Sequence, residues 1–464
     1  MQAAQRLKIK KPEFLGQRLQ DHKTRELSRT EIVSFFHQYG NRCKTQRLYL
    51  SSVIALKRAL VLDPNDPDLL SDYGAALWNY GDHVTAFEVL DRSLKIRPSS
   101  IAHGNMGLVM ESLGKLDDAE HQLREALELD SNHIGALWNL ALLKLSRGHW
   151  EEGFNLYECR KDPRGFQQYP KLRYPEWQGE DLNNKIILIH GEQGTGDRIL
   201  FSRYLIWLKE KYPSCHIKLI TSPEMQDLMW DFRNHVEFMW HGAPYRDINA
   251  DYCLFLMSLA RFHGSTPHNI PPDPGLIRKR IEKEKDQVIG FQPGGAFYPK
   301  TKTLKVGIRW TGNPKNESNN DRSIPLEFLL ELAENPHITL YNLQVGPGSE
   351  RISQLGAEHL CIDVGSSMAS QGYVGTAKTM LHLDLIITTC TSIAHLGGAL
   401  GVPTWVLLTT DPYWCWLRGI DHSPWYPSVR LFRQPAQGDW ISVVDSLKVQ
   451  LKEYAYRVPR EIGD

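Results

Sequence analysis

The sequence lacks paired cysteines, and this absence excludes two classes of protein. Its seven cysteines are scattered, odd in number and form no Cys-x-x-Cys pair. A disulfide framework or a structural zinc site needs several cysteines at regular spacing. We therefore expect neither disulfides nor a metal, and we expect a reducing compartment, the cytoplasm.

An excess of charge of one sign is also lacking, because Lys plus Arg and Asp plus Glu are both 54. We expect no general attraction to nucleic acid or to anionic lipid. The basic residues Arg6, Lys8, Lys10 and Lys11 are followed by no apolar run, so they do not form a secretory signal.

One stretch, residues 385–410, has no Asp, Glu, Lys or Arg and is long enough to span a bilayer. Threonines, glycines, a proline and His395 interrupt it, however, and β-branched clusters flank a central Ala/Gly/Leu segment. This pattern predicts strand, helix and strand, and no transmembrane segment.

The first half of the chain repeats itself. Four series of small residues recur at spacings of 33 or 34 residues: Gly74, Gly107 and Ala141; Gly81, Gly114 and Gly148; Ala86, Ala119 and Gly153; Ala59, Ser93 and Ala126. A period of about 34 with small residues where paired helices cross resembles tetratricopeptide repeats. We predict three and a half repeats over residues 31–160, the alternative being a helical bundle with an accidental period. Such an array holds a peptide or another protein on its concave face, and a homo-oligomer is a further candidate partner because these arrays often self-associate.

In the second half, strands alternate with helices, which predicts two parallel-sheet domains. Predicted strands cover residues 185–190, 216–220, 236–239 and 252–256, with a helix over 201–211, and then 306–310, 339–344, 385–388 and 404–408. The predicted divisions are an N-terminal arm (1–30), repeats (31–161), a linker (162–184), a first Rossmann-like domain (185–285), an interdomain linker (286–304), a second Rossmann-like domain (305–440) and a C-terminal helix (441–464). Ligands of such domains bind at the carboxyl ends of the strands.

The first predicted strand runs through three glycines, Gly191, Gly194 and Gly196, into a helix. This spacing imitates a P-loop, but a P-loop continues with Lys-Ser/Thr, whereas this chain continues Asp197-Arg198. The glycine order and the ribose-binding acid of a dinucleotide site are missing as well. A P-loop or NAD enzyme is therefore disfavoured. We interpret Asp197 as a residue for chemistry, the alternative being an ordinary charge at a helix N-terminus.

A second group of polar residues follows later strands. Hydroxyls at 388–392 stand where a strand ends and a small-residue helix begins, and Ser392 is the predicted N-cap. The free N–H groups and the dipole of such a helix favour an anion, although an ordinary capped helix has the same pattern. Asn313, Arg322 and Ser323 follow the strand at 306–310 and supply groups suited to phosphate oxygens.

Four runs, in this order and together with the repeats, resemble bacterial tetratricopeptide-repeat glycosyltransferases, which are similar in turn to the ADP-heptose transferases of lipopolysaccharide synthesis, glycosyltransferase family nine. The runs are Gly-Glu-Gln-Gly-Thr-Gly-Asp-Arg (191–198), Val-Gly-Ile-Arg-Trp-Thr-Gly-Asn-Pro (306–314) with Asn-Asp-Arg-Ser-Ile-Pro-Leu (320–326), Thr-Ser-Ile-Ala-His-Leu-Gly-Gly-Ala-Leu-Gly (391–401) and Asp-His-Ser-Pro-Trp-Tyr-Pro-Ser-Val-Arg-Leu-Phe-Arg-Gln (421–434). The resemblance implies a GT-B fold of two Rossmann-like domains and an inverting reaction that needs no metal or other cofactor. The nucleotide-sugar donor would bind the second domain and the acceptor would face the first.

The same resemblance implies roles for single residues. Asp197 matches an aspartate thought to act as general base on the acceptor hydroxyl, which is chemically reasonable for a carboxylate at a sheet edge. The other members of its loop, on the acceptor side, are Glu192, Gln193, Gly194 and Gly196. The donor-binding residues would be Trp310, Gly312, Asn313, Arg322, Ser323, Gln344, Gly346, Thr391, Ser392 and His395. His395 either orients a phosphate or packs, and we interpret Trp414, Trp416, Trp425 and Tyr426 as structural rather than sugar-stacking.

The chain also departs from the family pattern. Cys390 stands where relatives commonly have an aspartate, Gly375-Thr-Ala replaces Asp-Thr-Ala, and Pro412-Tyr-Trp-Cys-Trp replaces Pro-Asp-Trp-Arg-Trp. A thiol does not accept hydrogen bonds from sugar hydroxyls as a carboxylate does. The expected function is sugar transfer from an ADP, UDP or other nucleotide-diphosphate donor to a hydroxyl of a protein or glycan recruited by the repeats. The alternative is a scaffold whose transferase half is degenerate.

Overall fold

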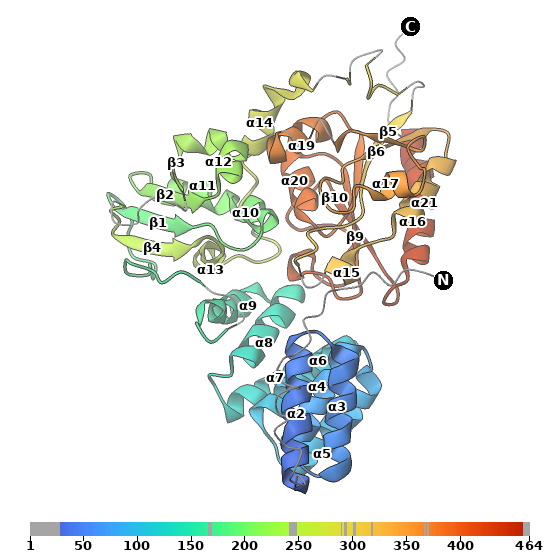
Figure 1. Cartoon of the computed structure of the whole chain (residues 1–464). Coiled ribbons are helices and arrows are strands. Elements are labelled where there is room, and N and C mark those ends of the chain that lie inside the picture. The colour runs from blue at the N-terminus through green and yellow to red at the C-terminus, as the bar shows by residue number, and fades with distance from the viewer. Residues whose placement is uncertain are drawn as a thin grey trace, which may run out of the picture. The chain divides into compact units, whose positions relative to one another are not determined.

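The computed structural model describes residues 28–165, 169–240, 248–288, 290–291, 295–299, 303–316, 319–365, 368 and 371–457. The chain forms two compact units, one up to residue 140 and one from residue 141 onward. In Figure 1 the colour runs by residue number from blue at the N-terminus to red at the C-terminus. The predicted N-terminal arm lies almost entirely outside the described residues, as do parts of the predicted interdomain linker and the end of the predicted C-terminal helix.

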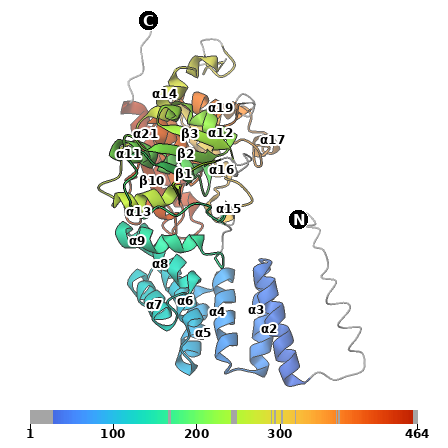
Figure 2. The same cartoon turned by 90° about the vertical axis from the view of Figure 1, so that its left-hand side faces the viewer.

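Helices follow one another in antiparallel pairs at the start of the described chain (Figure 2). The pairs are α2 (Arg29–Thr45) with α3 (Tyr49–Leu62), α4 (Pro67–Tyr80) with α5 (His83–Ile96), α6 (Ser100–Ser112) with α7 (Leu116–Leu129), and α8 (Ile134–Ser146) with α9 (Trp150–Tyr157). The described residues thus hold four helical pairs, so the prediction of three and a half was wrong. The signal for the first pair was Gly40, which precedes Gly74 by 34 residues.

Small residues at the repeated positions allow the two helices of a pair to approach closely. A Cβ atom at Gly74 would lie only 2.5 Å from the Cγ atom of Leu90 on the partner helix. The same arrangement recurs at Gly40 with Leu56 and at Gly107 with Leu123, at 2.6 and 2.7 Å. The repeat period therefore has a steric origin, since each pair places a leucine against a glycine.

The first sheet is parallel and has the strand order β3-β2-β1-β4. Its strands are β1 (Ile186–His190), β2 (His216–Thr221), β3 (Val236–Trp240) and β4 (Tyr252–Phe255). The helical segments of this domain are α10 (Thr195–Phe201), α11 (Arg203–Lys211), α12 (Pro223–Leu228), η2 (Trp230–Asn234), η4 (Leu256–Ser258), α13 (Leu259–His263) and α14 (Leu276–Glu282). All four predicted strands are present, but the helix predicted to begin at 201 begins six residues earlier, at Thr195, and breaks at Ser202.

The second sheet is also parallel, with the order β10-β9-β8-β5-β6-β7. Its strands are β5 (Leu304–Arg309), β6 (Ile338–Asn342), β7 (Cys361–Asp363), β8 (Leu385–Thr389), β9 (Thr404–Leu408) and β10 (Val429–Arg433). The helical segments after the first sheet are η5 (Lys285–Gln287), α15 (Asn319–Arg322), α16 (Leu326–Leu330), η6 (Glu331–Glu334), α17 (Arg351–Gln354), α19 (Gly372–Met380), α20 (Ser392–Leu400), η7 (Trp414–Trp416) and α21 (Trp440–Arg457). This strand order is that of a complete Rossmann fold, with the order reversing between β5 and β8.

Two strands of the second sheet were missed from sequence. The edge strand β7 has three residues, and β10 carries arginine at its second and last positions, so neither has the apolar run that identifies a buried strand. The strand predicted over 339–344 ends at Asn342, whose Oδ1 atom accepts a hydrogen bond from the Gln344 amide (2.7 Å) and turns the chain.

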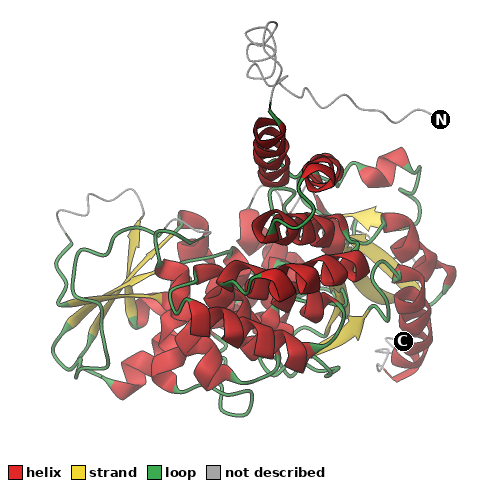
Figure 3. Ribbon diagram, turned by 90° about the horizontal axis from the view of Figure 1, so that it is seen from below, coloured by secondary structure: helices red, strands yellow, loops and turns green. Residues whose placement is uncertain are grey.

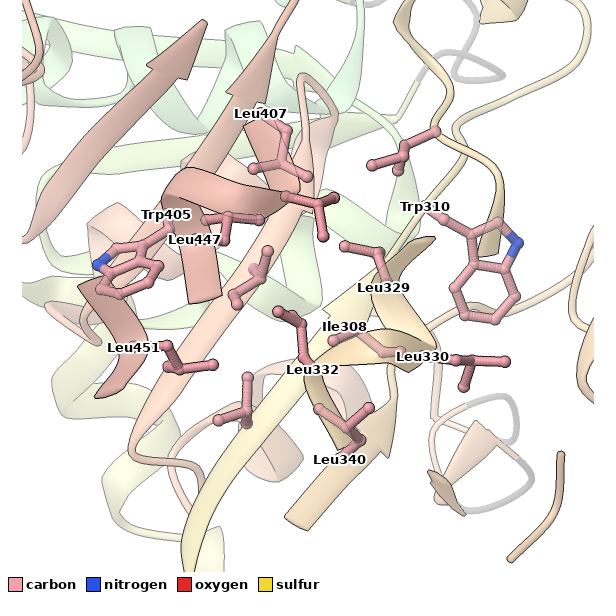
Figure 4. Packing of buried hydrophobic residues seen from close by; sticks show 14 of the residues in the cluster. Ile308, Trp310, Leu329, Leu330, Leu332, Leu340, Trp405, Leu407, Leu447 and Leu451 are labelled. Atoms are coloured by element: carbon pink, nitrogen blue, oxygen red, sulfur yellow. The ribbon is translucent and has the colours of Figure 1, made fainter. Parts of the chain in front are cut away.

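The core of the second domain lies between its sheet and the helices α16 and α21 (Figure 4). Ile308, Trp405 and Leu407 come from strands, and Leu329 and Leu447 from helices. The uncharged stretch 385–410 forms β8, α20 and β9, which confirms strand, helix and strand. In the part of the chain that the structure describes, no helix is long and apolar enough to cross a membrane.

The predicted fold class is confirmed. Helical repeats precede two Rossmann-like parallel-sheet domains, and Figure 3 shows the strands gathered in two separate groups. Ligands of such sheets bind where the strand order reverses, outside the carboxyl ends of the strands. In this chain those places are the ends of β1 and β4 and the ends of β5 and β8.

Candidate functional site

The glycine loop leaves the carboxyl end of β1 and enters α10. The Gly191 amide donates a hydrogen bond to the Ile220 carbonyl (2.8 Å), and a Cβ atom at Gly191 would lie 2.9 Å from that oxygen. Gln193 adopts a left-handed backbone conformation, with φ of 56°, which is uncommon for a residue other than glycine. Such strained positions occur preferentially at functional sites.

Asp197 lies in the first turn of α10 and remains partly exposed. Its Oδ1 atom accepts a hydrogen bond from the Tyr413 hydroxyl (2.9 Å), and its Oδ2 atom accepts one from the Gly194 amide (3.1 Å). Burial raises the pKa of Asp197 to about 6, and the two hydrogen bonds oppose that shift because they stabilise the ionised carboxylate. A carboxyl group with this pKa accepts a proton near neutral pH.

The neighbours of Asp197 in the loop are held by other parts of the chain. Arg160, in η1 (Glu158–Lys161), donates two hydrogen bonds to the Glu192 carboxylate, and the Met257 amide donates a third (2.9 Å). Gln193 donates a hydrogen bond to the Tyr169 hydroxyl (2.7 Å). The oxygens of Glu192 are thus engaged within the protein, and this side chain supports the loop.

A second loop leaves the carboxyl end of β5. The Gly312 amide donates a hydrogen bond to Asn319 Oδ1 (3.0 Å), and a Cβ atom at Gly312 would lie 2.6 Å from Arg322 Nη2. The Thr311 hydroxyl bonds to the Ser323 hydroxyl at 2.7 Å. The loop therefore brings Gly312, Arg322 and Ser323 together, with Asn319 as a buried support that sequence reasoning missed.

Other predicted donor residues near this loop are exposed in turns or buried inside the domain. Asn313 is exposed, and its Oδ1 atom accepts a hydrogen bond from the Lys315 amide (3.0 Å) within its own turn. Trp310 is buried in the hydrophobic core. Gln344 is buried as well, and it joins the Thr311 amide (3.3 Å) to the Pro347 carbonyl (3.0 Å). Gly346 is exposed, with φ of 76°.

The turn between β8 and α20 meets the second loop through Arg322. Arg322 Nη1 donates a hydrogen bond of 2.8 Å to the Cys390 carbonyl. Thr391 is the N-cap of α20, with an extended backbone and with its hydroxyl accepting from the Ile393 amide (3.3 Å). The prediction of Ser392 as N-cap was therefore wrong by one residue. The Ser392 hydroxyl instead bonds to the Tyr373 hydroxyl at 2.9 Å.

His395 packs within the domain. Its ring is buried and stacks on Trp416, with centroids 4.9 Å apart and an interplanar angle of 19°. Burial lowers the pKa of His395 to about 3, so the imidazole is neutral near pH 7. A Cβ atom at Gly196 would lie 2.7 Å from His395 Cδ2, so α10 and α20 touch at this point.

Several residues of the site were not found from the sequence. Tyr413 contacts Asp197, Tyr373 contacts Ser392, and Arg198 and Arg309 both interact electrostatically with Tyr373. The only signal for Tyr413 was its place in a run where the chain departs from its relatives. The four aromatic residues interpreted as structural, Trp414, Trp416, Trp425 and Tyr426, are all buried, which confirms that interpretation.

The site contains a carboxylate of raised pKa, an arginine and a helix N-terminus. Asp197 supplies a carboxylate of raised pKa, and Arg322 and the α20 N-terminus supply positive potential at the end of β8. The described residues contain no group of three or more His, Cys, Asp or Glu side chains that could hold a metal ion. This arrangement suits proton removal beside a negatively charged group.

Comparison with known proteins gives the following relatives. No protein-family model matches the chain. The chain is 26% identical over 439 residues to a protein of Caulobacter vibrioides called FlbA, covering 87% of this chain and 70% of FlbA.

Solved structures resemble the chain in part. One is a glycosyl transferase of family 9 from Veillonella parvula, with 11% identity, a TM-score of 0.37, and coverage of 61% of this chain and 92% of that one. Another is a mutant O-GlcNAc transferase of Thermobaculum terrenum, with 12% identity, a TM-score of 0.33, and coverage of 93% and 94%. A third is MamA, with 20% identity, a TM-score of 0.25, and coverage of 27% and 75%.

Proposed function

We propose that the chain is a glycosyltransferase that moves a sugar from a nucleotide-diphosphate donor to a hydroxyl group. The observation that carries this proposal is Asp197, a partly exposed carboxylate whose pKa burial raises to about 6 and which Tyr413 holds at 2.9 Å. Such a group is suited to act as general base for a hydroxyl nucleophile.

In the proposed reaction, the acceptor oxygen attacks C1 of the donor sugar. The bond between the acceptor oxygen and C1 forms while the bond between C1 and the diphosphate oxygen breaks, and attack from the opposite face inverts C1. The hydroxyl proton passes to Asp197, and the electron pair of the broken bond stays on the diphosphate. Arg322 and the N-terminus of α20 would stabilise that charge in the place of a divalent cation.

The strand order supports the placement of the donor in the second domain. The loop with Arg322 follows β5 and the turn with Ser392 follows β8, and the order of the sheet reverses between these two strands. Parallel sheets bind their ligands at this position.

The acceptor would be a protein or glycan that the helical repeats recruit, and a second copy of the chain is a further candidate partner. This part of the proposal rests on the general use of helical-repeat arrays as binding surfaces. A cytoplasmic location is proposed because none of the seven cysteines forms a disulfide.

One observation favours a second function, a scaffold with a degenerate transferase half. The Cys390 thiol accepts a hydrogen bond from Trp416 Nε1 (3.1 Å) beside Arg322, and burial raises the pKa of this thiol. A neutral thiol at this position offers no carboxylate to a donor sugar. A chain that had lost transfer would tolerate this change.

Calorimetry with UDP, ADP, GDP and their common sugar conjugates, with and without Mg²⁺, tests the proposal on the intact chain. We expect one nucleotide to bind saturably in both conditions and its sugar conjugate to be consumed in the presence of an acceptor. Asp197→Asn should bind that nucleotide within a few-fold and transfer no sugar. Absence of binding across the whole set would favour the scaffold, and unchanged turnover in Asp197→Asn would remove Asp197 from the reaction.

A further inference from the structure

Arg198 and Arg309 both interact electrostatically with the hydroxyl of Tyr373, and a third arginine, Arg322, acts on Arg309. Arg198 lies on α10, Arg309 at the end of β5, and Arg322 on α15. Burial lowers the pKa of Arg309, an effect that Arg322 strengthens and Tyr373 opposes. Burial also lowers the pKa of Arg198, and Asp197, Glu192 and Tyr373 act in the opposite direction. The guanidinium groups of both domains therefore lie within electrostatic range of the same phenol.

Among the described residues this positive charge forms no ion pair, although the Asp197 and Glu192 carboxylates act on Arg198 electrostatically. Arg309 donates hydrogen bonds to the carbonyls of Thr311 (3.2 Å) and Leu343 (3.3 Å), and Arg322 donates one to the Cys390 carbonyl. Carbonyl groups orient a guanidinium group but carry no net charge. None of the three arginines forms an ion pair with a residue in the described ranges.

Two of these arginines also have buried N–H donors without a hydrogen-bond partner among the described residues. The Nε atoms of Arg198 and Arg322 are buried and have no hydrogen-bond partner in the described part of the chain. A buried donor without a partner costs free energy unless a ligand or water satisfies it. Each guanidinium group has five N–H donors in a planar fork, which matches the oxygens of a phosphate group.

The two domains meet where these donors lie. A Cβ atom at Gly196 would lie 3.4 Å from Ser392 Cα, so the segment with Asp197 and Arg198 touches the first turn of α20. Ser392 in turn bonds to Tyr373. The α20 helix has 9 residues, and its first N–H groups add to the potential that favours an anion.

We propose that Arg198, which the first domain supplies, binds the diphosphate group of the donor nucleotide together with Arg309 and Arg322 of the second domain. This inference rests on the proposed function and assigns a donor contact to the domain expected to face the acceptor. Asp197 and Arg198 are consecutive, so one turn of helix carries both the proposed base and a cation for the leaving group. The diphosphate is thereby held from both sides, and donor binding joins the two domains.

Calorimetry on the full chain with Arg198→Gln tests this assignment, and Arg261→Gln is the matched control. Arg261 lies exposed on α13 of the same domain, over the ring of Phe262. We expect Arg198→Gln to weaken the binding of the cognate nucleoside diphosphate at least about 10-fold and the control to leave it unchanged. Arg198→Lys, which keeps the charge and loses the fork, should fall between the wild type and Arg198→Gln. The difference in nucleotide affinity between wild type and Arg198→Gln should shrink as the salt concentration rises.

Three further ligands test whether Arg198 binds the diphosphate of a nucleotide or a free anion: the nucleoside alone, its monophosphate and inorganic pyrophosphate. The nucleoside should bind equally well to wild type and to Arg198→Gln. Pyrophosphate, like the nucleoside diphosphate, should bind more weakly to Arg198→Gln than to wild type. If Arg198→Gln weakened pyrophosphate but left the nucleoside diphosphate unchanged, Arg198 would belong to a free-anion site and the inference would be overturned. If the wild type bound and transferred while Arg198→Gln bound equally well, this inference alone would fail. If the wild type bound no nucleotide, the proposed function would fail with it.

Discussion

The guanidinium group of Arg160 donates two hydrogen bonds to the carboxylate of Glu192, each 2.9 Å long. Both side chains are buried, with 0% and 3% of their surface exposed. Arg160 lies in η1, directly after α9, and Glu192 lies in the loop that carries Asp197. The pair therefore attaches the end of α9 to the glycine loop.

Replacing one member of this pair should destabilise the fold strongly. Arg160→Met leaves the Glu192 carboxylate buried without its cation, which typically costs roughly 3–5 kcal/mol. Urea unfolding followed by tryptophan fluorescence measures this loss. The double replacement Arg160→Met with Glu192→Met should be less destabilising, because it removes the buried Glu192 carboxylate together with its cation, and Glu158, which also pairs with Arg160, keeps its pair with Lys161.

Glu282→Gln serves as the control for this loss, because it breaks the exposed pair of Glu282 with Arg278, whose side chains are 43% and 46% exposed. That change should cost less than about 1 kcal/mol. Similar small losses in Glu282→Gln and Arg160→Met would show that the buried pair does not hold the loop.

Sugar transfer should decline in acid with the titration of Asp197. Only the ionised carboxylate accepts a proton, so kcat/KM should fall as the pH falls through about 6, the pKa to which burial raises this group. Tyr413→Phe removes a hydrogen bond that stabilises the ionised form, so the acid limb should move to higher pH. Tyr80→Phe, an exposed tyrosine of the repeats, is the control. An acid limb at the same pH in Tyr413→Phe and wild type would contradict this role of Tyr413.

The same carboxyl group should make the fold less stable at high pH. Because the pKa of Asp197 in the folded state, about 6, lies above its ordinary value of 3.8, the folded chain holds the proton more tightly than the unfolded chain. Its stabilising contribution is therefore present at low pH and lost as the pH rises through 6. Asp197→Asn should be more stable than wild type at pH 8 by roughly 1–2 kcal/mol, a range reduced for partial exposure. Thermal unfolding at several pH values should show the difference closing toward pH 4.

His395 should act in the opposite direction. Burial lowers its pKa from 6.5 to about 3, so the unfolded chain binds a proton at pH 5 that the folded chain does not. Stability is therefore lost as the pH falls below 6.5, by about 2 kcal/mol at pH 5. His395→Phe keeps a ring against Trp416 and should lose less stability between pH 7.5 and 5. An imidazole resonance that titrates near pH 6.5 and disappears in His395→Phe would contradict the buried, neutral state.

Paired helices of the repeats cross closely, so a larger side chain at the crossing point should destabilise the fold. Gly74→Ala places a Cβ atom 2.5 Å from Leu90 Cγ, so the helices must separate, at a cost of roughly 1–3 kcal/mol. Gly135→Ala is the control, because its nearest neighbour is a His133 side-chain atom at 3.4 Å. Gly135 is the second residue of α8, so that change should be nearly neutral, within about 0.5 kcal/mol. Equal behaviour of the two variants in thermal unfolding would argue against the close approach.

Much of the fold could be predicted from local patterns. The glycine at position 74 and its equivalents mark helices that cross closely, and the apolar runs at 186–190 and 385–389 mark buried strands. Errors arose where the local signal was weak or ambiguous. The strand β10 has arginines within it, and Thr391 and Ser392 are adjacent hydroxyls of which only the first has the extended backbone of an N-cap.

Residue types along the chain were sufficient to place Asp197 after β1, Arg322 after β5 and Ser392 after β8, because strand ends and glycine turns depend on neighbouring residues. The partners of these residues followed only from tertiary packing. Tyr413 reaches Asp197 across 216 positions, and Arg160 reaches Glu192 across 32. Such contacts depend on how two sheets and a helix pack together, and this packing has no periodicity that a single sequence displays. The burial that raises the pKa of Asp197 has the same origin, since it is created by segments far from Asp197 in the chain.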